Sequence, residues 1–131
     1  MTSTINPFLR QVLCIDAAVS GVAGLLMAAG APILSPLLGL PEGLLFWAGV
    51  ALFPFVALLI VVARRGQTSR PILIDIIAIN ALWVAASFGL LVSGAVSPTI
   101  LGYAFVIAQA LVVALLGGMQ FVGLRRTTAN A

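Results

Sequence analysis

The chain has 131 residues, of which 63% are hydrophobic and 7% are charged, and its formal net charge is +3. A soluble domain carries about 25% charged residues, so we expect lipid rather than water to surround most of this chain. The charge comes from arginines at segment ends that form no basic face, which excludes nucleic acid as a partner.

Four apolar segments of 20 to 25 residues follow one another along the chain: Phe8–Ala29, Leu44–Ala63, Ile72–Ser93 and Ile100–Leu124. A helix needs about 20 residues to cross roughly 30 Å of hydrocarbon. The segments lack the alternation that is typical of barrel strands. The sequence therefore predicts an all-α fold, an up-down four-helix transmembrane bundle that forms one domain over residues 1–131.

Capping and proline signals precede each segment, and they are Asn6-Pro7, Pro41-Glu42, Ser69 and Ser97-Pro98. The first segment is long for a signal peptide and is interrupted by Asp16, so we interpret it as a retained helix. The apolar stretch Ala31–Pro41 is predicted to be an outer loop. In that loop, Ser35-Pro36 could start a short interfacial helix, or the loop could form a docking surface.

The arginines predict the orientation of the bundle. If the four segments cross a membrane in turn, all basic residues lie on the same side of it: Arg10, Arg64, Arg65, Arg70, Arg125 and Arg126. The positive-inside rule then places both termini in the cytoplasm. The use of arginine without lysine is typical of GC-rich bacterial genes, so we expect a multi-pass protein of the bacterial inner (plasma) membrane.

The two halves of the chain have similar spacings. Arg10 and Arg70 are 60 residues apart, and Asp16 and Asp75 are 59 apart. A parallel repeat of two helical hairpins would explain these spacings. Any two similar hairpins would show them as well, so both interpretations stay open.

Five residues form the first predicted site, a polar cluster within the membrane near its cytoplasmic edge: Asp16, Asp75, Gln120, Arg10 and Arg70. Charged residues inside a membrane are costly and mark either a functional site or an interhelical ion pair. The functional interpretation is a proton-titratable or cation-binding site. The structural one is that arginine–aspartate pairs hold the helices together, and we favour it.

Three further polar residues, Asn80, Gln109 and Ser87, are predicted to make contacts near the midplane of the third and fourth helices. Amides on neighbouring helices usually bond each other, although a substrate site is an alternative. In the first helix, small residues recur at Ser20, Gly24 and Ala28. Such a stripe serves either internal packing or docking on a partner.

No catalytic, metal-binding or cofactor-binding motif is recognisable. The chain has one cysteine, Cys14, and no histidine, so we expect no disulfide framework, no metal site and no cofactor. An enzyme would need a base, a nucleophile or a metal triad in one layer, and we therefore expect a protein that is not an enzyme.

The strings Leu13-Cys-Ile-Asp16 and Asn80-Ala-Leu-Trp83 resemble those of small four-helix bacterial integral membrane proteins that are mostly uncharacterised. This resemblance implies the same fold and no particular activity. The chain is also similar to the small multidrug resistance family, which has four helices and an essential membrane acid in the first. That family has glutamate where this chain has Asp16, and its aromatic motifs are missing here.

The sequence favours a small accessory, assembly or lipid-interacting subunit that packs through its helices. Its partners would be membrane lipids, with a membrane protein or a second copy of the chain as further options. The alternative is a proton-coupled transporter of a small hydrophobic or cationic solute, which would use Asp16 and Asp75.

Overall fold

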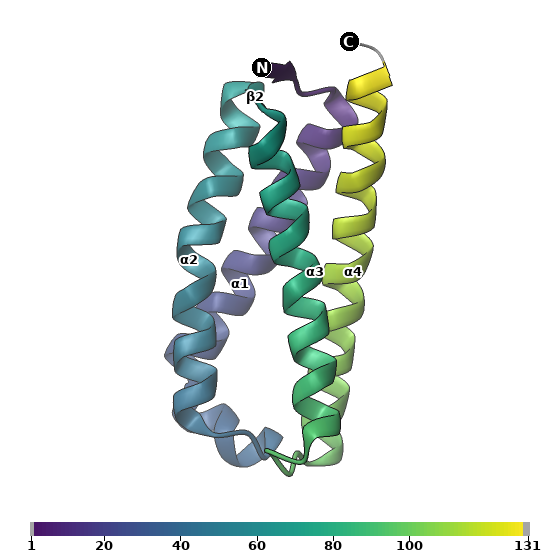
Figure 1. The fold of residues 1–131 in the computed structure, drawn as a ribbon. Coiled ribbons are helices and arrows are strands. Elements are labelled where there is room, and N and C mark those ends of the chain that lie inside the picture. Colours follow the sequence, from purple (N-terminus) through teal and green to yellow (C-terminus); the bar gives the residue numbers. More distant parts are fainter. Residues whose placement is uncertain (1, 130–131) are drawn as a thin grey trace.

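A computed structural model describes residues 2–129 of the chain, with side chains over residues 5–125. It contains four long helices, α1 (Pro7–Leu38), α2 (Glu42–Arg65), α3 (Arg70–Ser93) and α4 (Ile100–Ala129). Each is long and apolar enough to cross a membrane. They run up and down in one bundle (Figure 1), so the prediction of an all-α four-helix architecture is confirmed.

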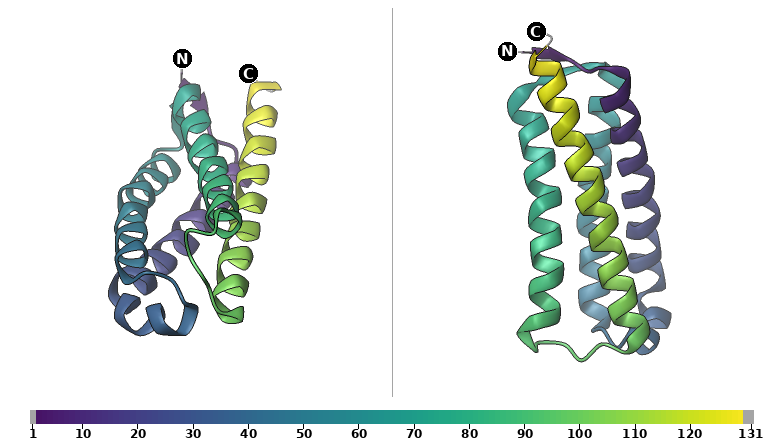
Figure 2. Two further views of the ribbon diagram at one scale, coloured as in Figure 1. Left: turned by 60° about the horizontal axis from the view of Figure 1, so that its bottom comes forward. Right: turned by 90° about the vertical axis from the view of Figure 1, so that its right-hand side faces the viewer.

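Helix α1 is longer than predicted. It continues nine residues past Ala29 and contains Pro32 and Pro36. The prediction of an outer loop over Ala31–Pro41 is therefore wrong for most of that stretch. Proline removes a backbone bond and bends a helix without necessarily ending it, and the last turns of α1 curve across the lower end of the bundle (Figure 2). Gly39, whose φ of 68° suits glycine, ends the helix by donating to the Ser35 carbonyl.

The curved end of α1 supports the start of α4. The Thr99 backbone N–H donates to the Leu38 carbonyl over 3.0 Å, and the Thr99 hydroxyl donates to the Leu37 carbonyl over 2.8 Å. The same hydroxyl accepts from the Gly102 N–H and so caps α4. The predicted cap at Ser97-Pro98 is therefore wrong, because the helix begins at Ile100 and its capping position is Thr99.

A short ribbon, which the sequence did not predict, closes the opposite end. Strand β1 (Thr2–Thr4) pairs antiparallel with β2 (Gln67–Ser69) in the loop between α2 and α3. The Asn6 side chain then accepts from the Leu9 N–H over 2.7 Å and starts α1 as predicted. The α2–α3 loop is thus tied to the amino-terminal segment.

Helices α1 and α2 pack most closely of all pairs. A Cβ built on Gly49 of α2 would lie 2.6 Å from the Ala28 backbone nitrogen and 2.7 Å from the Gly24 carbonyl oxygen, so only glycine fits. The small residues of α1 therefore serve packing inside the bundle. Helix α4 contacts α1 and α3, whereas α2 and α3 lie apart without comparable packing.

The first and last elements meet at one end of the bundle, where β1 contacts α4 (Figure 1). The arginines whose side chains are described are all exposed and belong to this end: Arg10, Arg64, Arg65, Arg70 and Arg125. The Arg126 side chain lies outside the described part. The described arginines therefore lie together at one end of the bundle, as the sequence predicted.

Candidate functional site

Asp16 is the centre of a buried polar cluster. Its carboxylate accepts the Ser20 hydroxyl over 3.0 Å, the Asn80 amide over 3.0 Å and the Gln120 amide over 2.6 Å. The Asn80 amide also donates to Gln120 Oε1 over 2.8 Å. All four residues are at least 94% buried. Helices α1, α3 and α4 therefore meet through one hydrogen-bonded network.

Helix geometry explains why these side chains converge. Asp16 lies nine residues into α1 and Asn80 ten residues into α3, both counted from the same end of the bundle. At about 1.5 Å per residue they reach the same depth. Ser20 follows Asp16 by four residues, one turn of the helix, and therefore lies on the same face.

The structure brings together two of the five residues of the predicted cluster, Asp16 and Gln120. Asp75 does not join them because it is exposed and lies five residues before Asn80, a rotation of about 140° around α3. Arg10 is also exposed, about 120° around α1 from Asp16, and its guanidinium lies near Gly66. Arg70 is exposed at the first residue of α3. Amides and a hydroxyl, rather than arginines, satisfy Asp16.

The midplane residues form a second layer. Trp83 Nε1 donates to Gln109 Oε1 over 2.6 Å, and Gln109 Nε2 donates to the Ser87 hydroxyl over 3.0 Å. Asn80 does not take part, since its amide is used in the Asp16 network. The expected bond between amides of α3 and α4 does form, but between Asn80 and Gln120.

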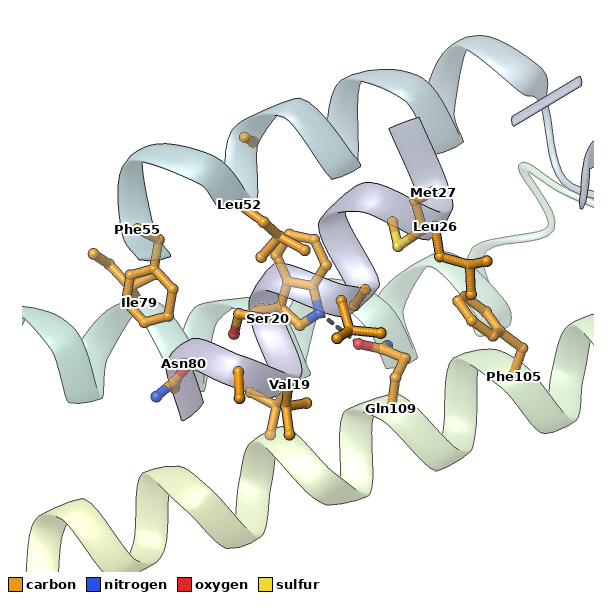
Figure 3. A pocket seen from close by; sticks show the side chains of 16 residues that line it. Val19, Ser20, Leu26, Met27, Leu52, Phe55, Ile79, Asn80, Phe105 and Gln109 are labelled. Atoms are coloured by element: carbon orange, nitrogen blue, oxygen red, sulfur yellow. Dashed lines mark hydrogen bonds between the residues drawn. The ribbon is translucent and has the colours of Figure 1, made fainter. Parts of the chain in front are cut away.

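An apolar cavity of about 600 Å³ lies among the four helices, and residues of both polar layers line it (Figure 3). Asn80 and Phe55 lie at one end, Gln109 near the middle, and Met27 and Phe105 at the other end. Its volume falls within the range of small-molecule sites, roughly 300–1,000 Å³. All four helices contribute to the wall, and polar side chains interrupt it at only a few places.

A smaller cavity of about 300 Å³ lies beside the first, and the two share wall residues: Met27, Trp83, Phe105 and Gln109. Val22 and Leu26 of the larger cavity are 67% and 49% exposed. The larger cavity is therefore reachable from the outer surface of the helices, the surface that faces lipid in a membrane.

Sequence reasoning missed two partners and the cavity. The signal for Ser20 as a partner of Asp16 was its spacing of four residues, which was interpreted only as part of a small-residue stripe. Trp83 shares a helix face with Asn80 and Ser87 but was not expected to bond Gln109. No local pattern marks Met27, Phe55 or Phe105 as cavity residues, because they come from three helices.

The two halves of the chain differ at the positions that suggested a repeat. Asp16 is fully buried and bonded, whereas Asp75 is exposed. The two aspartates are therefore not equivalent chemically, and a role shared between them is not supported by their surroundings.

Comparisons of the chain with protein-family models, curated proteins and solved structures find no match. The cavity and the two polar layers are the features of the structure that bear on function. Within the described residues, no group of three acidic or cysteine side chains could hold a metal ion.

Proposed function

We propose that the protein is a non-enzymatic multi-pass protein of the bacterial inner membrane that holds one apolar small molecule or lipid chain between its helices. The observation that carries this proposal is the cavity of about 600 Å³ in the bundle. A membrane interior offers no water to fill an apolar space, and an empty cavity costs the contacts of its lining. Occupation by an apolar molecule would restore those contacts.

The surroundings of the cavity support a binding role over one in partner docking. The small residues of α1 could have formed a docking stripe, but Gly24 and Ala28 face Gly49 of α2 and Ser20 bonds Asp16, so they are used inside the bundle. The cavity, in contrast, has a mostly apolar wall and is reachable from the outer surface of the helices. We therefore place a lipid-interacting role before an assembly subunit that works only through helix contacts.

Transport of a small hydrophobic or cationic solute is the second candidate. The observation in its favour is that Ser20 and Asn80, two wall residues, bond the buried carboxylate of Asp16. A titratable group next to a binding site could couple solute movement to protons. This version uses Asp16 alone, because Asp75 is exposed.

We further propose that both termini are cytoplasmic. The support is the position of the exposed arginines, which lie at the end of the bundle that holds the start of α1 and the end of α2. At that end they could contact anionic lipid headgroups, at about 1 kcal/mol each. A membrane protein or second copy of the chain remains a further proposed partner.

A cavity-filling variant tests the binding role. In Ala23→Phe, the ring would enter the cavity, whereas in Ala81→Phe it would face outward from α3, because Ala81 is exposed and does not line the cavity. The protein would be extracted gently from its host membrane and its bound small molecules measured by native mass spectrometry. We expect a bound apolar molecule in the wild type and Ala81→Phe and its loss in Ala23→Phe. Equal amounts bound to all three proteins would refute the role of the cavity.

A further inference from the structure

The N–H groups in the middle of the cavity wall are already bonded inside the protein. Trp83 Nε1 donates to Gln109 Oε1. Both hydrogens of Gln109 Nε2 are used, one by the Ser87 hydroxyl over 3.0 Å and one by the Val106 carbonyl over 2.9 Å. An amide nitrogen has two hydrogens and an indole nitrogen one, so neither side chain retains a donor for a bound molecule.

The hydrogen-bond donors of Asn80 and Ser20, on another part of the cavity wall, are used as well. Asn80 Nδ2 donates one hydrogen to Asp16 and the other to Gln120, and the single hydroxyl hydrogen of Ser20 points to Asp16. The carboxylate fixes this arrangement. If the Asn80 amide were reversed, its oxygen would face the oxygens of Asp16 and Gln120 and both hydrogen bonds would be lost.

Hydrogen-bond acceptors, in contrast, remain available. No described residue donates to Asn80 Oδ1, although Asn80 is 97% buried. Every fully enclosed side-chain nitrogen or oxygen of the described residues has a partner, so this oxygen must border open space. Asn80 lines the larger cavity. Because its Nδ2 is committed to Asp16 and Gln120, the oxygen is the polar atom of Asn80 that is left for a molecule in the cavity. The Ser20 oxygen, on the same wall, also keeps its lone pairs.

We infer that the molecule bound in this cavity is an apolar body with a hydrogen-bond donor at one end, a hydroxyl or an amine. A donor would satisfy the free oxygen of Asn80. A ligand whose only polar group is an ether or carbonyl oxygen would place that oxygen against the oxygens of the wall, where no donor is left to receive it. This inference rests on the proposed function and deepens it by naming the chemical class of the ligand.

A matched pair of probes tests the inference on the intact protein. The probes are a bromine-tipped dodecyl alcohol and its methyl ether, which differ only in whether the oxygen can donate. The protein would carry Trp47→Phe, because Trp47 is exposed and lies outside the cavities, and this leaves Trp83 as its single tryptophan. In nanodiscs, saturable quenching of Trp83 by bromine would report occupation of the cavity, beyond the linear quenching caused by partition into lipid.

We expect the alcohol to bind about three- to ten-fold more tightly than the ether, the ratio that one net hydrogen bond produces. Equal binding, or tighter binding of the ether, would overturn the inference while leaving the cavity as a binding site. If neither probe gives saturable quenching, the proposed function itself fails, so the two failures are distinguishable.

A variant tests whether Asn80 is the residue that favours the alcohol over the ether. Asn80→Leu keeps a side chain of similar length and removes the free oxygen together with the amide bonds to Asp16 and Gln120. We expect the ratio of alcohol to ether affinity to fall while the ether still binds. Ser93→Ala, an exposed change near the end of the same helix and outside the cavities, is the control and should keep the full ratio. A ratio that survives in Asn80→Leu would overturn the assignment to Asn80.

Discussion

The two aspartates within the apolar helices should differ sharply in their effect on stability. Asp16→Ala removes the acceptor of three hydrogen bonds, from Ser20, Asn80 and Gln120. Side-chain hydrogen bonds inside membrane proteins contribute about 0.6 kcal/mol on average and up to about 1.7 kcal/mol each. Three of them give an expected loss of about 2 to 5 kcal/mol in the free energy of unfolding.

The control for this prediction is Asp75→Ala. Asp75 is exposed, and no described residue bonds its side chain, so we expect a change below about 0.5 kcal/mol. A third variant, Asp16→Asn, should lose less than Asp16→Ala. Its oxygen can still accept from Asn80 and Gln120, while its amide donates to the Ser20 oxygen.

Unfolding in mixed micelles with increasing sodium dodecyl sulfate, followed by tryptophan fluorescence, would measure all three variants. The helices remain inserted in the detergent-rich state, so the cost of placing a charge in an apolar medium cancels to first order and the measurement reports interhelical contacts. If Asp16→Ala unfolds at the same detergent fraction as the wild type, or if Asp75→Ala is equally destabilised, the network does not hold the helices together and the reasoning is refuted.

Three further predictions use other parts of the bundle. Gly49→Ala should lower the free energy of unfolding by about 1–3 kcal/mol in the same titration, because its Cβ would meet backbone atoms of α1. Gly89→Ala is the control, since it has open space around it and should be neutral or slightly stabilising. Equal effects of the two variants would contradict the close packing of α1 and α2. Gln109→Leu leaves the Trp83 indole N–H without its acceptor, so the emission of Trp83 should move to shorter wavelength at a cost of about 1–3 kcal/mol, and an unchanged spectrum would argue against this bond. A single cysteine at Gln67, in a background without the native cysteine, should react with an impermeant maleimide only from the cytoplasmic side. One in the loop between α3 and α4 should react only from the other side, and the reverse pattern would invert the proposed orientation.

The sequence by itself determined that this protein forms four long apolar helices. Long apolar segments with capping residues between them predict helices wherever they occur, because hydrocarbon requires every backbone group to be bonded within its own segment. The signals at Asn6-Pro7 and Pro41-Glu42 marked helix starts correctly, and the arginines marked one end of the bundle. The sequence misled after Ala29, where a proline-rich outer loop was predicted although α1 continues through Pro32 and Pro36 to Leu38, as a helix that bends at proline can do.

Only the tertiary structure decided which polar residues meet. Asp16 and Asp75 look alike in sequence, but rotation around the helix sends one into the bundle and the other outward. Asn80 and Gln120 became partners of Asp16 because three helices reach the same depth with those faces inward. The cavity has no sequence signal at all, since it is space left where α2 and α3 do not pack on each other. A local pattern records the face and depth of a residue on its own helix, whereas a site between helices depends on their relative positions.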